Sequence, residues 1–222
     1  MDFNPVYISL KTTVCASCIT YVLGILSAYL VLRIRNRKIR HIMDVILTLP
    51  LVLPPTVAGF FLLYLFGNRR PLGILIQQLF GQKVVFTWAA TVIAAVVVSF
   101  PLMYRSVKAG FEQLNQSIVE EAKMLGLGGF GMLWRILVPC TMPAILSGTV
   151  LSTTRALGEF GATAMLAGNI SGKTRTLSLA VYSEVAAGNM DIAGYYVAII
   201  LVVAFLAVMV LNVKGDHSDI KL

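Results

Sequence analysis

The sequence predicts an all-α membrane protein built as a bundle of five transmembrane helices. Of its 222 residues, 58% are hydrophobic and 13% are charged, and the mean hydropathy is +0.84. This composition excludes an ordinary soluble domain. The apolar residues form separate blocks, each near the ~20 residues with which a helix crosses a bilayer. Lipid offers the peptide groups no hydrogen-bond partners, so the blocks must be helical.

We expect one transmembrane domain over residues 1–222, with no linker and no internal repeat. The first block is longer than a signal-peptide core and has no basic leader, so we interpret it as a permanent span. Leu72–Phe80 is apolar enough for a short surface helix. Residues 176–188 predict an external or re-entrant helix, since a sixth span would move the C-terminus outside. The predicted spans cover residues 6–32, 42–66, 84–104, 142–166 and 192–213.

Positive charge predicts the orientation. The connection between the first two spans, residues 33–40, carries five Lys or Arg residues and should be cytoplasmic. The N-terminus is then outside, the segment around residues 117–139 inside and the C-terminus inside. The inside segments hold 11 basic residues and the outside ones hold five. The net charge of +8 therefore reflects topology and attraction to anionic lipid, and it requires no nucleic acid.

A polar, glycine-rich segment lies between the third and fourth spans, in residues 117–143. Ser117 and Glu120 have the spacing of an N-terminal capping box. Gly126 and the glycines after it break the first helix. A second short helix should place Phe130, Leu133, Trp134 and Leu137 on one stripe and be stopped by Pro139 and Pro143. Two short amphipathic helices joined by a glycine bend can sit in a groove of another protein; alone, such a helix can also lie on the membrane surface.

This segment resembles the coupling loop of binding-protein-dependent ABC importer permeases, which reads E-A-A, three residues, G, nine residues, I-x-L-P. Glu121 replaces the middle alanine of the motif and Val138 replaces its leucine. The resemblance implies that the loop, residues 117–139, binds a cytoplasmic ATPase. The candidate coupling residues are Glu120, Glu121, Ala122, Gly126, Ile136 and Pro139.

Charged residues interrupt the fourth predicted span at Ser152–Ala164. Arg155 and Glu159 are spaced i, i+4 and can pair, which offsets part of the cost of charge in a bilayer. The neighbouring glycines allow close packing or a helix break. Two interpretations stay open: a self-neutralised pair that locks the bundle, or a gate on a central pathway with Phe160 as its plug. The candidate gate residues are Arg155, Gly158, Glu159, Phe160, Gly161 and Thr163.

The second predicted span contains the proline-rich stretch Leu49–Gly59. Proline lacks a backbone donor, and irregular backbone survives at membrane depth only when it is buried in protein or lines a cavity. Transporter pathways use broken helices in this way, although a simple kink that fits neighbouring helices is equally compatible. The candidate pathway residues here are Pro54, Pro55 and Thr56.

Taken together, LPLVLPPTVAG and RALGEFGA resemble the molybdate-type oxyanion permeases, and secondarily the sulfate and tungstate permeases, over nearly the whole chain. The resemblance implies the type I ABC importer permease fold in a prokaryotic cytoplasmic membrane. It also implies a homodimer, two copies of a cytoplasmic ATPase, an extracytoplasmic oxyanion-binding protein and molybdate as substrate. A secondary transporter driven by an ion gradient is the alternative. It would require a carboxylate relay or inverted repeats.

The chain itself should carry no catalytic, cofactor or metal site. Ala167–Thr174 fits a relaxed phosphate-loop pattern, but such a loop must follow a strand, and an apolar helix precedes it here. Cys15 and Cys18 form a C-x-x-C inside an apolar helix, where small packed residues are the better interpretation. The sequence therefore predicts a protein that is not an enzyme, with ATP used by the partner.

Overall fold

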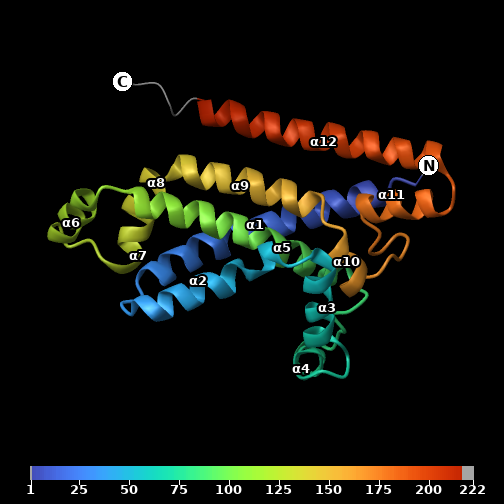
Figure 1. Cartoon of the computed structure of the whole chain (residues 1–222), viewed down its shortest axis with the longest axis horizontal. Coiled ribbons are helices and arrows are strands. Elements are labelled where there is room, and N and C mark those ends of the chain that lie inside the picture. Colours follow the sequence, from blue (N-terminus) through green and yellow to red (C-terminus); the bar gives the residue numbers. More distant parts are fainter. Residues whose placement is uncertain (1, 217–222) are drawn as a thin grey trace.

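The computed structural model describes residues 2–216 as helices joined by loops, with no strand in that range. The predicted all-α fold is confirmed. The main helices of the bundle run lengthwise along the molecule (Figure 1). They are α1 (Asn4–Leu32), α5 (Trp88–Gln113), α9 (Met142–Leu157) and α12 (Met190–Asp216).

Small residues set how closely α1, α5 and α9 pack. A Cβ at Gly24 of α1 would lie 2.5 Å from Met103 Cγ on α5. A Cβ at Gly110 of α5 would lie 2.7 Å from Ala144 Cβ on α9, and one at Gly148 would lie 2.8 Å from Ser106 Cβ. Without a hydrophobic driving force between helices in lipid, such close approach is a main source of helix association.

Hydroxyl pairs tie the same helices together. Thr12 of α1 pairs with Thr91 of α5 at 2.9 Å, and Thr20 pairs with Ser99 at 3.2 Å. These four hydroxyls are buried, so each satisfies a polar group that lipid would leave without a partner.

The predicted second span is two helices, α2 (Arg37–Val52) and α3 (Pro55–Phe66), whose axes differ by 114°. Leu53 precedes a proline and is extended, with ψ 139°, because the proline ring disfavours the α conformation before it. Figure 1 shows α2 beside the bundle and α3 turning away from it toward α4 (Pro71–Phe80). The short helix expected at Leu72–Phe80 is α4.

The predicted fourth span is also broken, between α9 and α10 (Gly161–Leu166). The two broken spans meet here, because α10 packs on α3. A Cβ at Gly59 of α3 would lie 2.7 Å from Ala162 Cα, and one at Gly161 would lie 2.9 Å from Pro55 Cβ. The segment 176–188 contains α11 (Leu177–Ala186), which packs on α12.

The polar segment between α5 and α9 forms a compact knob at one end of the bundle (Figure 1). It consists of α6 (Gln116–Met124), α7 (Gly129–Met132), the π-helical turn η1 (Leu133–Leu137) and α8 (Val138–Cys140). We call residues 115–140 the knob. In Figure 1 the N-terminal end of α1 lies at the opposite end of the molecule.

Within residues 2–216, length and apolarity allow up to five spans. Three helices, α1, α5 and α12, are long and apolar enough to cross a membrane alone. The count reaches five if α2 with α3, and the helix pair that meets at Thr141 with an 81° bend, are each one broken span. Of the three cysteines, Cys15 is partly buried, but Cys18 and Cys140 are exposed. The expectation of two packed cysteines is therefore wrong for Cys18.

The close contact at Gly110 gives a stability prediction. Alanine raises helix propensity over glycine by about 1 kcal/mol, but overpacking costs about 1–3 kcal/mol. We expect Gly110→Ala to lower the thermal unfolding midpoint in detergent. Gly194→Ala is the matched control, since Gly194 is a helical glycine of α12 whose added Cβ meets no atom within 4 Å. Equal midpoints for the two variants would contradict the packing argument.

Candidate functional site

The first helix of the knob is capped by Asn115. Its side chain accepts a hydrogen bond from the Ser117 N–H at 3.1 Å, and α6 begins at Gln116. The predicted capping box is therefore wrong, because Ser117 lies inside the first turn. Asn115 has an extended backbone with ψ 125° and is at least as good an N-cap as serine, so the helix begins two residues earlier than the motif suggested.

Gly126 ends α6 in a left-handed conformation, with φ +79°. The Gly126 N–H donates to Lys123 O at 2.9 Å, and the Leu127 N–H donates to Ala122 O at 2.9 Å. These two bonds form a Schellman motif, which favours glycine because a Cβ destabilises the left-handed conformation. The sharp reversal between the two knob helices therefore depends on Gly126, one of the candidate coupling residues.

The outer surface of the knob combines carboxylates with bare apolar side chains. Glu120 and Glu121 are exposed, whereas Ala122 is buried. Met124 and Leu125 are 81% and 82% exposed. Exposed apolar groups of this size rimmed by charge are typical of a protein–protein contact.

The second knob helix differs from the predicted stripe. Leu133 is buried, but Phe130 and Trp134 are exposed, so the four residues do not share one face. The turn at Leu133–Leu137 is π-helical. The stop predicted at Pro139 and Pro143 lies between these two prolines, and Pro139 itself does not end the helix. Helix α8 passes through Pro139, the wider turn before it accommodates the missing donor, and the break comes at Thr141. Of the two remaining candidates, Ile136 is partly buried and Pro139 is exposed.

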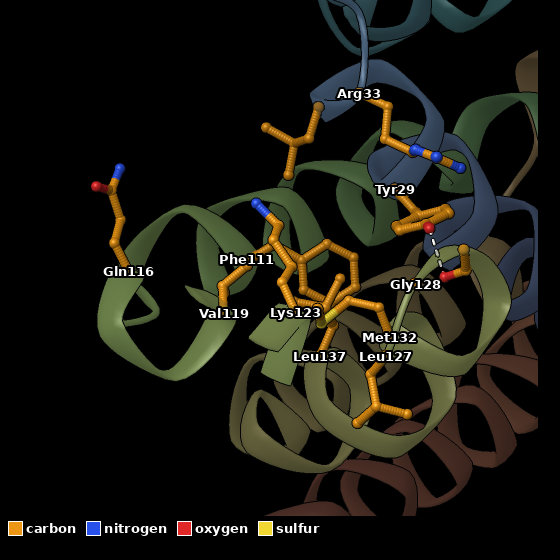
Figure 2. Close-up of a pocket in the computed structure, with 12 residues that line it drawn as sticks. Tyr29, Arg33, Phe111, Gln116, Val119, Lys123, Leu127, Gly128, Met132 and Leu137 are labelled. Atoms are coloured by element: carbon orange, nitrogen blue, oxygen red, sulfur yellow. Dashed lines mark hydrogen bonds between the residues drawn. The ribbon is translucent and has the colours of Figure 1, made fainter. Parts of the chain in front are cut away.

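The knob is braced against the end of α1. The Tyr29 hydroxyl donates to Gly129 O at 2.6 Å, and Figure 2 shows this tyrosine reaching the backbone of the Gly128–Gly129 turn. The Arg33 guanidinium lies over the Tyr29 ring at 5.3 Å. A cavity of about 540 Å³ lies between the knob, α1 and the end of α5, lined by Phe111, Lys123 and Met132 among others. The knob is therefore fixed to α1 at its glycine turn and is less tightly packed beside it.

Glu159 organises the break in the fourth predicted span. Its Oε2 lies 2.7 Å from Arg155 Nη1, and its Oε1 accepts the Ala162 N–H at 2.7 Å. The carboxylate therefore pairs with the last turn of α9 and caps the first turn of α10. The Glu159 side chain is 2% exposed and that of Arg155 is 29% exposed, so the acid is the deeply buried partner.

The two candidate pathway stretches lie against each other. Gly158 ends α9, and Phe160 packs its ring on Tyr182 of α11 with centroids 5.2 Å apart. Gly161 approaches Pro55 and Thr56 so closely that an added Cβ would lie 3.0 Å from the Thr56 N atom. The exposed residues of this region are Pro54, Pro55, Thr56 and Gly158, whereas Gly161 and Thr163 are buried. Which of them borders a pathway stays a prediction.

One polar cluster was missed by the sequence reasoning. Asp44 of α2 lies 2.6 Å from Lys108 of α5, through Oδ2 and Nζ, and its other oxygen accepts the Tyr104 hydroxyl. An acidic residue near the start of a predicted span was the available signal, but its partner on another span could not be identified from spacing.

The phosphate-loop pattern at Ala167–Thr174 follows helix α10 and closes on itself. The Thr174 hydroxyl accepts the Ile170 N–H at 3.0 Å and donates to Gly168 O at 3.2 Å. The Thr174 hydroxyl is therefore already hydrogen-bonded within the loop.

Over residues 2–216, no group of three or more His, Cys, Asp or Glu side chains is arranged to hold a metal ion.

The sequence matches the family described as binding-protein-dependent transport system inner membrane component over residues 20–214. The chain belongs to this family. It is 40% identical over 215 residues to a putative molybdenum transport system permease protein YvgM of Bacillus subtilis, covering 97% of this chain and 94% of the relative. It is 38% identical to the molybdenum transport system permease protein ModB of Escherichia coli K12, covering 82% and 79%.

Solved structures show the same fold. A bacterial ABC transporter that imports the acidic polysaccharide alginate superposes with a TM-score of 0.79 at 16% identity, covering 98% of this chain and 80% of that one. The MetNI methionine ABC transporter, in inward-facing conformations, gives 0.75 at 14% identity, covering 96% and 94%. The fold is thus that of ABC transporter permeases, and the protein is a multi-pass component of the inner membrane.

The double role of Glu159 gives a second prediction. Glu159→Gln retains an acceptor for the Ala162 N–H and loses the ion pair, whereas Glu159→Leu loses both. We expect the thermal unfolding midpoint in detergent to fall from wild type to Gln and again from Gln to Leu. The second fall should correspond to a loss of about 1 kcal/mol in the free energy of unfolding, the cost of a lost cap. A leucine variant as stable as the glutamine variant would refute the capping role.

Proposed function

We propose that this chain is the membrane permease subunit of an ATP-driven importer and that molybdate is its substrate. The observation that carries the proposal is the 40% identity to a putative molybdenum permease over 97% of the chain. The 38% identity to a second molybdenum permease supports it. Tungstate and sulfate are the alternative substrates, because they are tetrahedral dianions of similar shape.

In this proposal a separate cytoplasmic ATPase supplies the energy and the chain performs no catalysis. The knob is the element that the ATPase would grip: its exposed Met124, Leu125 and Phe130 can enter an apolar groove while Glu120 and Glu121 contact the rim. Closure of two ATPases on ATP would pull two knobs together and tilt the spans, switching the pathway between inward- and outward-facing.

The assembly would be a homodimer around one pathway, with an extracytoplasmic oxyanion-binding protein delivering the anion. The chain offers surface for such contacts. Only 11% of the apolar window in α12 is buried, and no residue of α2 is fully buried. A second copy of the chain and membrane lipid would cover these faces. The charge bias of the loops supports an N-terminus outside and a C-terminus inside, with the knob in the cytoplasm.

We assign the gate to the break between α9 and α10, which contains Glu159 and Phe160 and where Gly161 approaches Pro55 and Thr56. Charge buried at membrane depth is costly and tends to be functional. Glu159→Gln should therefore alter basal ATP hydrolysis or uptake in the assembled transporter; normal values for both would leave the pair with a purely structural role.

Uptake by the reconstituted complex tests the proposal directly. Proteoliposomes containing the chain and its companion ATPase, with the companion binding protein outside, should accumulate molybdate only when ATP is enclosed. We expect tungstate to compete and sulfate to compete less. Uptake that needs an ion gradient and no ATP would establish the secondary-transporter alternative, and uptake of sulfate alone would reassign the substrate.

The Schellman turn gives a matched test of the coupling assignment. Gly126→Ala places a side chain at φ +79°, which costs about 1–3 kcal/mol, so we expect less ATPase to co-purify with the chain and uptake to fall. Gly128→Ala is the control, because Gly128 has φ −144° and an added Cβ meets nothing within 4 Å.

Both variants are first compared for thermal stability, so that a general loss of folding is recognised. Wild-type co-purification and uptake in Gly126→Ala would contradict the role of the turn in coupling. A loss of the same size in Gly128→Ala would show that the two glycines matter for another reason.

A further inference from the structure

A sheltered polar contact joins α2 to α5. Lys108 Nζ lies 2.6 Å from Asp44 Oδ2, and the Tyr104 hydroxyl donates to the other carboxylate oxygen. The side chains of Asp44 and Lys108 are 20% and 17% exposed, and Tyr104 is buried. Separating such a pair would leave a poorly solvated charge without its partner, so the two helices are held together at this point.

Helix α2 has few other attachments to the bundle. Its Met43 and Leu47 pack against the core, but a groove of about 310 Å³ lies between the next turn of α2, at Pro50, and the α1 and α5 helices. Within residues 2–216, every hydrogen bond from α2 to another helix ends on Asp44. The contact of Asp44 is therefore the specific link between this helix and α5.

The contact between Asp44 and Lys108 lies between the knob and helix α3. Lys108 stands near the end of α5 at Gln113, and only two residues, Leu114 and Asn115, separate α5 from α6 of the knob. On the other side, α2 leads through Leu53 and Pro54 into α3, which packs on α10. The contact thus lies between the knob and the segment assigned to the gate.

Building on the proposed function, we propose that Asp44 is a positioning residue of the transport cycle. Through Lys108 and Tyr104 it makes α2 follow the movement of α5, so that displacement of the knob reaches α3 and the gate. Without this link α5 can move while α2 stays behind, because the groove beside Pro50 leaves little apolar packing to carry the motion. Asp44 touches neither the substrate nor the ATPase in this scheme.

The test measures ATP hydrolysis by the reconstituted complex, with and without molybdate-loaded binding protein. Asp44→Asn keeps the size of the side chain and removes its charge. We expect it to lower the ratio of stimulated to basal hydrolysis about fivefold or more, the size of a typical coupling between sites. Lys108→Gln, which retains the bond between Asp44 and Tyr104, should lower it in the same direction.

Glu112→Gln is the matched control. Glu112 lies 3.6 Å from the same Lys108 but on the same helix, at i, i+4, so its loss removes an equal charge without separating α2 from α5. We expect the wild-type ratio for this variant. Exchanging the two charges, Asp44→Lys with Lys108→Asp, should recover part of the ratio, because the ion pair between α2 and α5 is restored; an effect of either single change that is independent of the pair would give no recovery.

The outcomes separate this inference from the proposed function. If the wild-type complex shows no stimulation by the loaded binding protein, the proposed function fails. If the wild-type complex is stimulated and Asp44→Asn keeps its ratio, only the inference is overturned. A fall of equal size in Glu112→Gln, or no recovery on charge exchange, would also overturn it. An unchanged unfolding midpoint in Asp44→Asn, together with a reduced ratio, would support it.

Discussion

Peptide groups inside a bilayer have no water to bond, so a helix can break there only where the protein itself supplies the missing partners. The rest of this structure depends on how that constraint is met at one carboxylate. Glu159 caps the first turn of α10 and pairs with Arg155 in the last turn of α9. The break is therefore stable although it lies between two apolar helices, and a polar residue that looked anomalous in a span serves the backbone around it.

The other break uses proline in place of a cap, and the two breaks lie together. Pro54 and Pro55 separate α2 from α3. Proline has no backbone N–H, so neither residue leaves a donor without an acceptor at the start of α3. The absence of a side chain at Gly161 lets α10 reach the backbone of Thr56. The two breaks thus pack against each other at Gly59 and Gly161, while Pro54, Pro55, Thr56 and Gly158 stay exposed.

The knob and this double break lie in different parts of the molecule (Figure 1), and continuous helices connect them. The knob is fixed to α1 through Tyr29 and continues directly from α5. Rigid helices with a few polar links can carry a displacement over such a distance if they have two discrete arrangements. The glycine contacts between α1, α5 and α9 pack these three helices closely. Helix α2 packs on them through Met43 and Leu47, and within residues 2–216 its hydrogen bonds to another helix all involve Asp44.

Sequence patterns alone determined the class of this protein, because length and apolarity of a block are local properties and lipid accepts only helices. They also located the glycine-rich segment that forms the knob and both irregular stretches, since glycine, proline and charge within an apolar block are visible in one dimension. The i, i+4 pair of Arg155 and Glu159 could be predicted for the same reason: helical spacing is fixed by the backbone.

Only the tertiary structure decided the rest. The N-cap is Asn115 and not the predicted Ser117, because two residues that can cap a helix lie two positions apart. The predicted stripe in the second knob helix is divided, with Leu133 buried and Phe130 and Trp134 exposed, because packing on the bundle decides which side of the helix is covered. Long-range partners gave no local signal. The packing of α3 on α10 and the pairing of Asp44 with Lys108 depend on where distant helices cross, which is set by close contacts such as those at Gly110 and not by any spacing along the chain.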